Sequence, residues 1–447
     1  MAKIPNQSSK WSGLPKETDM GQPGAGPWNY TLLSEPQLST EISRIALTSQ
    51  STGTVHVASF QPNEAPENGI GNQDVAVVED WDVKGELWRF RAVFDGHANG
   101  NETVEFASQT LPSLVRERLT DLVAAKAEGS TPSSSSDSDA VKNLLASAIT
   151  DLDDSITKDL QSLFPSEKFI EGLSSEEIQR IVNDKDKGGA NFTKVARSMR
   201  GTTVIIALIS PHGDVWTATV GDSQAVIGIK THSGEWVTKP LSFNHNANEA
   251  TEIQRICREH PGEDLVIADG RVLGVIAVTR AIGDHMFKVP AVYTSRVFSN
   301  VEGGFRQGPE ELAKVMKVVT RNITPPYLSS VPDIVHLNLT DEGATHACLI
   351  LCSDGLLDLY GSDKRGDSEL DMAGMADPWI RMVGEESLVP LPPSKATDVE
   401  ANLSLRLIYN GLGGGQNDLD EMSRMITVEM ENKWMDDTTV IVQGLSL

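Results

Sequence analysis

Aspartates at the ends of apolar segments are the residues in this sequence whose types and spacing could carry out chemistry. Asp95 ends the segment "AVFDG", Asp222 follows an apolar run in "ATVGDS", and Asp354 does the same in "LILCSDG". Asp74 and Asp436 open apolar segments in "GNQDVAVV" and "MDDTTVIV". A carboxylate beside a buried strand is costly unless it is paired or bound to a cation. These side chains therefore either form turns or hold a ligand.

A hard divalent cation is the ligand that suits this set of side chains. Any one Asp-Gly pair is an ordinary turn sequence. Five carboxylates that converged on one rim would repel one another, and Mg²⁺ or Mn²⁺ prefers carboxylate, carbonyl and water oxygens. His97 follows Asp95 and Gly96 directly. We therefore predict a metal site with a histidine beside it.

The elements that must position these aspartates are short strands and paired helices. β-branched or alternating runs predict strands at residues 54–60, 74–80, 87–95, 201–210, 214–223, 224–230, 332–339, 346–354 and 438–445. Helical periodicity predicts helices near 101–122, 140–164, 246–260, 397–410 and 418–432, with Pro112 kinking or breaking the first of them. Helices that come in pairs, rather than in alternation with strands, favour an α+β fold in which antiparallel sheets form a layered sandwich with helices outside.

The domain organisation follows from changes in composition along the chain. Residues 1–50 are rich in Pro, Gly and Ser, which predicts an extended N-terminal arm. Residues 51–447 offer no convincing internal boundary, so we expect one domain with insertions near 124–140, 285–325 and 361–395. We expect a mobile loop at the low-complexity stretch 129–139 and irregular structure at 361–395.

Charge and cysteine content limit the class of protein. The chain has 38 Lys and Arg against 63 Asp and Glu, a net charge of −25. This balance argues against nucleic-acid binding and against anionic membrane surfaces. Cys348 and Cys352 lie in the apolar run "ACLILC" and are expected to be buried thiols in a reducing compartment. With no apolar segment of membrane-spanning length and no leader-like N-terminus, we expect an intracellular, cytoplasmic protein.

Seven ordered motifs resemble those of the metal-dependent serine/threonine protein phosphatases of type 2C, from about residue 53 to the C-terminus. They are "FDGHANG", "RGTTV", "VGDSQAV", "FNHNANEATEIQRI", "RVLGVIAVTRAIGD", "CSDGLLD" and "MDDTTVIV". The stretch "TPPYLSSVPDIV" and the double Asp in "MDDTTV" look most like the pyruvate dehydrogenase phosphatase branch. That branch would place the protein in the mitochondrial matrix if a presequence is missing. The resemblance implies a four-layer α-β-β-α sandwich of two antiparallel sheets flanked by helix pairs.

The resemblance also implies roles for individual residues around two Mg²⁺ or Mn²⁺ ions. It makes Asp95 the bridging ligand and His97 the group that protonates the leaving oxygen. The other implied ligands are the carbonyl of Gly96, Asp354 and Asp436, with Asp74 close by through water, and Asp222 with Asp358 for a third, weaker ion. A hydroxide that bridges the ions would attack the phosphorus, and an imidazole with a pKa near ~6.5 could supply the proton.

Four positions depart from the usual family pattern. Gly69, preceded by Asn68, stands where the family has an arginine that grips the substrate phosphate, so Asn68 is the candidate for a weaker, uncharged contact. Gln73 replaces a glutamate beside Asp74. Gln224 replaces an arginine, and Asn244 replaces an aspartate. Losing a charge-assisted phosphate contact could cost on the order of 1.5–3 kcal/mol in substrate binding.

The expected function is hydrolysis of phosphoserine and phosphothreonine in phosphoproteins by a monomeric enzyme. Two alternatives stay open: a phosphatase for a small-molecule phosphate or diphosphate, and a pseudophosphatase scaffold with weak or no turnover. Arg271 and Arg280 could each reach a phosphate, but salt bridges within this acidic chain are the favoured interpretation. For His245 we expect a structural role.

Overall fold

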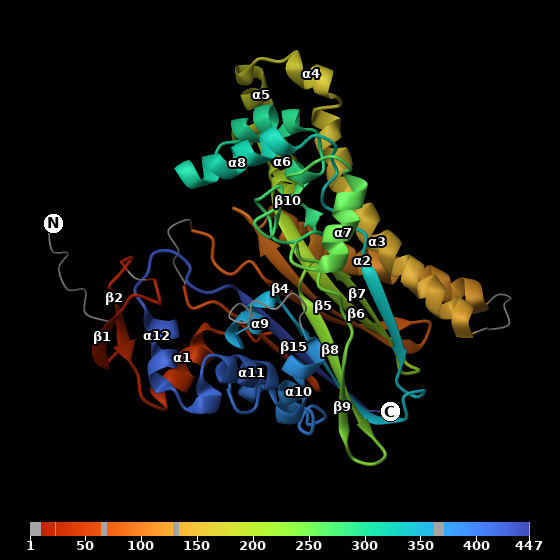
Figure 1. Ribbon diagram of the computed structural model, residues 1–447. Coiled ribbons are helices and arrows are strands. Elements are labelled where there is room, and N and C mark those ends of the chain that lie inside the picture. The colour runs from red at the N-terminus through yellow and green to blue at the C-terminus, as the bar shows by residue number, and fades with distance from the viewer. Residues whose placement is uncertain are drawn as a thin grey trace.

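Two antiparallel β-sheets packed face to face form the centre of the computed structural model, which describes residues 10–22, 24–63, 69–127, 134–306, 308–361 and 371–446 (Figure 1). The first sheet has the spatial order β13 (Asp333–Asn338), β7 (Asp214–Val220), β6 (Gly201–Ile209), β5 (Glu86–His97) and β4 (Val75–Val83), and β12 (Ile282–Gly283) pairs with β6. The second has the order β3 (Val55–Phe60), β15 (Thr438–Ser446), β14 (Ala344–Cys352), β8 (Gln224–Thr231) and β9 (Trp236–Pro240). All pairs in both sheets are antiparallel.

Strand β6 shows why the central strands read as continuous apolar runs. Successive side chains of a strand point to opposite faces. Ile205 and Ala207 pack in the core between the two sheets, whereas Val204 and Ile206 pack in the core beneath the outer helices. Both faces of β6 are therefore buried, and all nine of its residues are inaccessible to solvent.

Helices cover the outer face of each sheet, so the expected four-layer sandwich is confirmed. The first sheet is covered by the long antiparallel pair α2 (Glu102–Ala127) and α3 (Ser134–Leu163). Against the second sheet lie α9 (Asp354–Leu359), α10 (Met372–Val383), α11 (Leu403–Gly411) and α12 (Leu419–Thr427). Pro112 does not break α2, because its neighbours Leu111 and Val115 are fully buried and their packing outweighs one lost backbone hydrogen bond.

A helical region formed largely by residues 164–200 and 245–331 stands above one end of the sandwich (Figure 1). Its elements are α4 (Glu167–Glu171), α5 (Ser175–Val182), α6 (Ala190–Met199), α7 (Ala250–Glu259), α8 (Pro309–Arg321), β10 (Ile267–Ala268) and β11 (Arg271–Val272). Short helical turns occur at Lys185–Lys187, His285–Phe287, Tyr293–Val297, Phe298–Asn300, Pro393–Lys395 and Gly414–Gln416. The region has two small cores of its own, one around Phe164 and one around Tyr327.

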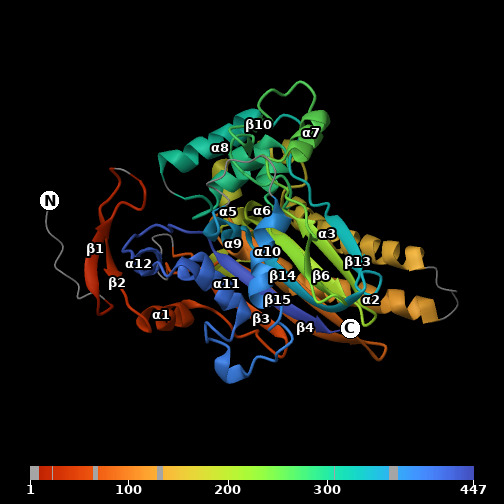
Figure 2. The same ribbon diagram turned by 60° about the horizontal axis from the view of Figure 1, so that its bottom comes forward.

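The described part of residues 1–50 is not the extended arm expected from its composition. It forms the hairpin β1 (Leu14–Thr18) and β2 (Trp28–Leu32), followed by α1 (Gln37–Ile45). The backbone N–H of Thr31 donates to Thr427 Oγ1 at 2.9 Å, and that of Leu33 donates to Ser423 Oγ at 2.9 Å. Figures 1 and 2 both show the hairpin beside α12. These bonds satisfy the free edge of β2 and hold the segment on the second helical layer.

Two other segments also differ from the expectation. The stretch 361–395 was expected to be irregular, but it contains the helix α10, whose Trp379 and Ile380 are fully buried. Helix α3 begins at Ser134, inside the expected mobile loop, and residues 128–133 and 362–370 lie outside the described residues. Cys348 and Cys352 are buried in β14 as expected, and Cys257 is exposed.

No helix in the described ranges is both long enough and apolar enough to span a bilayer.

Candidate metal centre and active site

Five of the aspartates singled out above meet at one edge of the sandwich. Asp95 lies near the end of β5 and Asp74 directly precedes β4, while Asp222 follows β7. Asp354 begins α9 after β14, and Asp436 lies two residues before β15. Neighbouring antiparallel strands run in opposite directions, so the end of one and the start of the next lie at the same edge. The structure therefore brings these carboxylates together from both sheets.

The carboxylates are close enough to raise one another's pKa. Burial, and then the charges of Asp74, Asp354, Asp436 and Asp222, raise the pKa of Asp95 well above 3.8. Burial and the neighbouring charges of Asp222 and Asp436 act on Asp354 in the same way. Carboxylates in such a cluster stay ionised at neutral pH only if positive charge enters it, and a bound divalent cation reverses the direction of these shifts.

Three carboxylates lie at the border of the cluster. Burial and the charge of Asp437 raise the pKa of Asp74 to about 8. Asp358 is exposed on α9, four residues after Asp354, and its charge contributes to the raised pKa of Asp354. Asp436 is exposed at the mouth of the cluster, yet desolvation by the surrounding protein still raises its pKa.

The donor set fits hard divalent cations. Asp74 accepts a hydrogen bond from Ser353 Oγ at 2.7 Å through Oδ2, while its Oδ1 is buried with no hydrogen-bond partner. Asp354 Oδ1 is also buried and unpartnered. Oxygens of this kind are what Mg²⁺ or Mn²⁺ would satisfy. Within the described ranges, no three His, Cys, Asp or Glu side chains are grouped closely enough to hold a metal ion as they stand. The side chains of the cluster would therefore have to move closer together on binding an ion.

Gly96 and Gln73 pack against each other where the first motif enters the site. A Cβ on Gly96 would lie 2.8 Å from the carbonyl oxygen of Gln73, so only glycine fits. Gln73 donates its backbone N–H to Asp437 Oδ2 at 2.7 Å and its side-chain amide to the carbonyl of Gly100 at 2.9 Å. The amide thus supports the loop that follows His97. Asn68 lies outside the described residues, and Gly69 has a φ of 68°.

His97 is paired with a buried aspartate that sequence reasoning did not single out. Its Nε2 lies 2.6 Å from Oδ2 of Asp284, and a Cβ on Gly201 would lie 1.9 Å from that same oxygen. Burial alone would lower the pKa of His97, but Asp284, followed by Asp222 and Asp436, raises it above 6.5. The signal was present, because "AIGD" ends an apolar run in Gly-Asp as "TVGD" does.

Asp222 is held by residues of the segment that follows β9. Asn246 Nδ2 donates to Asp222 Oδ2 at 3.1 Å, and the N–H of Gly221 donates to His245 Nδ1 at 3.2 Å. His245 Nε2 must then carry the hydrogen, which it donates to Asp333 Oδ2 at 2.9 Å. Burial lowers the pKa of His245, which keeps the imidazole neutral in this arrangement. His245 is therefore structural, as expected.

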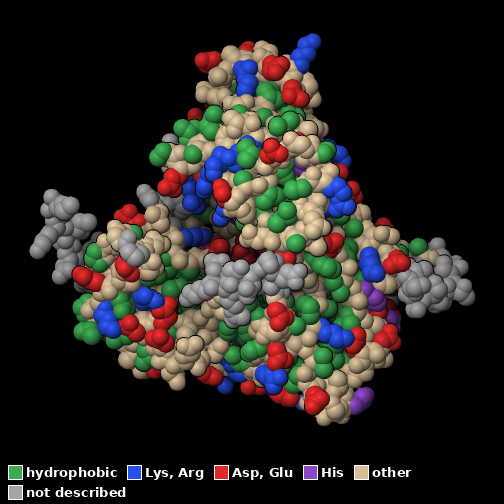
Figure 3. Space-filling view, viewed as in Figure 1, with side chains coloured by type: hydrophobic (Ala, Val, Ile, Leu, Met, Phe, Trp, Pro, Cys, Tyr) green, Lys and Arg blue, Asp and Glu red, His purple; other side chains and the backbone are tan. Residues whose placement is uncertain are grey.

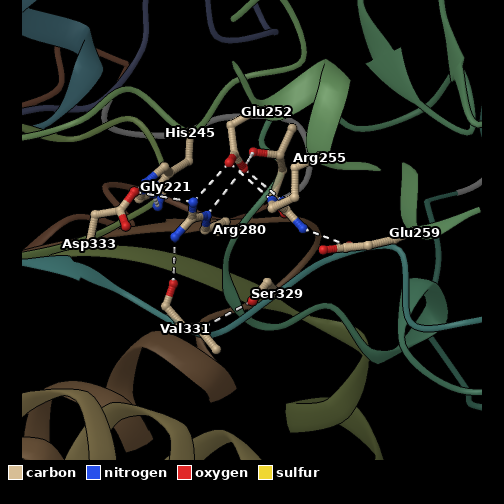
Figure 4. Close-up of polar contacts among 10 residues, drawn as sticks. Gly221, His245, Glu252, Arg255, Glu259, Arg280, Ser329, Val331 and Asp333 are labelled. Atoms are coloured by element: carbon tan, nitrogen blue, oxygen red, sulfur yellow. Dashed lines mark hydrogen bonds and ion pairs between the residues drawn. The ribbon is translucent and has the colours of Figure 1, made fainter. Parts of the chain in front are cut away.

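Arg280 is used inside the protein, as the salt-bridge interpretation expected (Figure 4). Its guanidinium lies 2.8 and 3.1 Å from the two carboxylate oxygens of Glu252 and 3.1 Å from Asp333 Oδ2. It also donates to the carbonyl of Val331 at 2.9 Å. This network links α7 to β13 and, through His245, to the loop that carries Asp222. Arg271 is exposed and donates to the carbonyl of Val275.

The remaining departures from the family pattern make hydrogen bonds in two places, the loop of Asp222 and the start of α7. Gln224 Nε2 donates to the carbonyl of Asp222 at 2.9 Å, and Asn244 Nδ2 donates to Glu249 Oε1 at 2.8 Å.

Beside the cluster lies a cavity of about 780 Å³ whose lining includes Asp358, Trp434 and Asp436. Figure 3 shows acidic side chains at the floor of a hollow on this face, below the upper helical region.

Comparison with known proteins agrees with this geometry. The family model described as "Protein phosphatase 2C" matches residues 74–365. A protein phosphatase 2C homolog of Schizosaccharomyces pombe is 23% identical over 390 residues, which cover 85% of this chain and 78% of that protein. The mitochondrial pyruvate dehydrogenase (acetyl-transferring) phosphatase 1 of Saccharomyces cerevisiae is 25% identical over 290 residues, covering 58% of this chain and 48% of that protein.

Two further matches complete the comparison. Human mitochondrial pyruvate dehydrogenase (acetyl-transferring) phosphatase 2 is 28% identical over 242 residues, covering 50% of this chain and 44% of that protein. The aligned part thus spans about half the length of these two pyruvate dehydrogenase phosphatases. The crystal structure of serine-threonine phosphatase 2C from Toxoplasma gondii superposes with a TM-score of 0.45 at 14% identity, covering 89% of this chain and 98% of that one.

Proposed function

The chain belongs to the protein phosphatase 2C family, and on this premise we propose that it hydrolyses phosphoserine and phosphothreonine in proteins with the help of Mg²⁺ or Mn²⁺. Members of this family are metal-dependent serine/threonine protein phosphatases, and the chain is related to the pyruvate dehydrogenase phosphatase branch. The observation that carries the proposal is the convergence of five carboxylates from both sheets beside the His97–Asp284 pair.

The carboxylate cluster is the proposed site of two cations. Asp95, Asp354, Asp436 and the carbonyl of Gly96 would hold them, with Asp74 nearby, and Asp222 with Asp358 would hold a third, weaker ion. When bound, such ions make hydroxide available near neutral pH and neutralise charge on a phosphate. The orphaned oxygens of Asp74 and Asp354 support this assignment.

His97 is the proposed proton donor to the serine or threonine oxygen that leaves. A leaving alkoxide needs a proton, and an imidazolium within reach can supply it. Asp284 Oδ2 lies 2.6 Å from Nε2, and its charge raises the pKa of His97, which favours the acid form. Asp284 is thus a positioning residue that also tunes the acid.

A protein substrate is favoured because the site is open at its mouth. Asp358 and Asp436 are exposed there, next to the cavity of about 780 Å³. A phosphorylated segment could therefore approach the carboxylates from solvent. We further propose that residues 51–447 act as one catalytic domain and that the enzyme is a cytoplasmic monomer. The mitochondrial relatives make the matrix the alternative compartment, which cell fractionation would decide.

A mixed substrate panel tests the proposed function. Wild type and Asp95→Asn are assayed with Mn²⁺ against phosphoserine and phosphothreonine peptides, an aryl phosphate, and a set of small-molecule phosphates and diphosphates. We expect wild type to prefer the phosphopeptides and the variant to lose at least about a hundredfold in turnover, because the bridging carboxylate is gone. Preference for a metabolite would establish the small-molecule alternative. Metal binding without turnover on any substrate would establish a scaffold.

A further inference from the structure

A phosphorylated substrate brings about two negative charges into a site that is already rich in carboxylates. A protein cation that meets this charge must be accessible as well as have a donor to spare. Arg280, whose side chain is 10% exposed, contacts Glu252, Asp333 and the carbonyl of Val331. Lys288, whose side chain is 8% exposed, donates to Asp153 at 2.7 Å and to the carbonyl of Ala281 at 2.8 Å. These two cations are buried in contacts that belong to the fold.

Lys433 is held at the metal centre by a buried carboxylate. Its Nζ lies 2.8 Å from Oδ1 and 2.9 Å from Oδ2 of Asp437. Asp437 follows Asp436 in the chain, and its Oδ2 also accepts the N–H of Gln73, the residue before Asp74. One carboxylate thus fixes the ammonium group between the two segments that carry Asp436 and Asp74.

The ammonium group keeps a donor for a ligand. A lysine ammonium has three N–H groups, and the contacts described for Lys433 use two of them. The side chain of Lys433 is 22% exposed, whereas that of Asp437 is 3% exposed. The part of this pair that faces solvent is therefore the cation.

The loop that carries Lys433 is fixed and lies beside the cavity. Gln61 Nε2 donates to the carbonyl of Met435 at 3.2 Å, and Trp434 Nε1 donates to the carbonyl of Met425 at 2.9 Å. Trp434, Met435 and Asp436 all line the cavity of about 780 Å³. Lys433 directly precedes this lining in the chain, and its head group is held on Asp437, the residue after Asp436.

We propose that Lys433 binds the phosphate of the substrate and supplies the positive charge that the segment around Gly69 lacks. The inference rests on the proposed phosphatase function and adds a specific substrate contact to it. Phosphate bound there would be held between the metal centre and a fixed ammonium group.

The test compares Lys433→Met and Lys433→Arg with a matched control, Lys230→Met. Lys230 pairs with Glu385 at 2.7 Å and its side chain is 23% exposed, but it lies on β8 away from the cluster. The readouts are KM and kcat for a phosphothreonine peptide, inhibition by inorganic phosphate, and Mn²⁺ affinity by calorimetry. We expect Lys433→Met to raise KM and the inhibition constant for phosphate by roughly ten- to a hundredfold. Mn²⁺ affinity should stay within about threefold, and Lys433→Arg should recover most of the loss.

Two results would overturn the assignment. One is a KM and a phosphate inhibition constant that Lys433→Met leaves within twofold of wild type. The other is a fall in Mn²⁺ affinity that Lys433→Arg does not rescue, since Lys433 would then only hold Asp437. If wild type turns over no substrate, the proposed function fails, and binding of inorganic phosphate to the Mn²⁺-loaded protein still decides the role of Lys433. In that case, the absence of phosphate binding to the Mn²⁺-loaded wild type would overturn the role of Lys433 as well.

Discussion

At the scale of residues, the pair of His97 with Asp284 makes the proposed acid role of His97 testable. We expect Asp284→Asn to lower the pKa of His97, because the nearest negative charge is removed. A group whose pKa is raised stays protonated until the pH rises through that pKa, so the acid-dependent activity of wild type should persist to a higher pH. The variant should lose activity at a lower pH, with kcat about tenfold below wild type at pH 8.

The pH profile of kcat between 5 and 9 measures this effect. Asp377→Asn is a suitable control, because Asp377 pairs with Arg381 on the surface helix α10. That control should reproduce the wild-type profile. An Asp284→Asn profile whose alkaline limb coincides with that of wild type would show that Asp284 does not tune His97.

Single residues could be predicted where the chemistry is local in sequence. Asp95, Asp222 and Asp354 each end an apolar run, and this pattern alone was enough to group them. The partnership of Asp284 with His97 could not be predicted this way. It depends on the pairing of β12 with β6, which places Gly283 opposite Gly201 although 82 residues separate them. The contact of Lys433 with the centre likewise needs Asp437 to meet Gln73, far away in the chain.

At the scale of elements, the network around Arg280 fastens α7 and β13 to the loop of Asp222. Arg280→Met removes a partner from the buried Glu252 and from Asp333, whose side chain is 39% exposed. We expect the free energy of unfolding to fall by about 3 kcal/mol, the typical cost of breaking a buried pair. Urea denaturation measures this, and amide exchange at Gly221 should become faster because the support of His245 is weakened.

Arg381→Met provides the matched comparison for this prediction. The Arg381–Asp377 pair is an i,i+4 pair on a helix, and the arginine side chain is 73% exposed. Its loss should change the free energy of unfolding by less than about 0.5 kcal/mol. Equal effects of the two substitutions would contradict the importance of the buried network.

Strands were easier to predict than helices in this chain. The strands of both sheets that end at the metal centre have buried, β-branched runs that are bounded by turn residues, as in β6 and β14. The helices α4 and α5 are only five and eight residues long, which is too short for a periodic pattern to stand out. The hairpin β1–β2 was missed because β1 is largely exposed and β2 is stabilised by α12, a contact made across 396 residues.

At the scale of the whole molecule, the carboxylate cluster lies where the two sheets meet. Asp74, Asp95 and Asp222 belong to the first sheet, while Asp354 and Asp436 belong to the second. The α+β class and the layered sandwich could be predicted from the order of elements. The closing of the second sheet by β3 and β15, which lie at opposite ends of the chain, could not, because no local pattern specifies the partner of a strand.

The central claim is that these strand-end carboxylates form one cation centre. Mn²⁺ calorimetry on wild type and Asp95→Asn tests it, after circular dichroism has shown that both proteins are folded. Wild type should bind at least two ions and release protons at pH 7, because the pKa values of Asp74 and Asp95 are raised in the metal-free protein. Asp95→Asn should lose the tight sites. Equal Mn²⁺ binding by the two proteins, or no binding by wild type, would contradict the account.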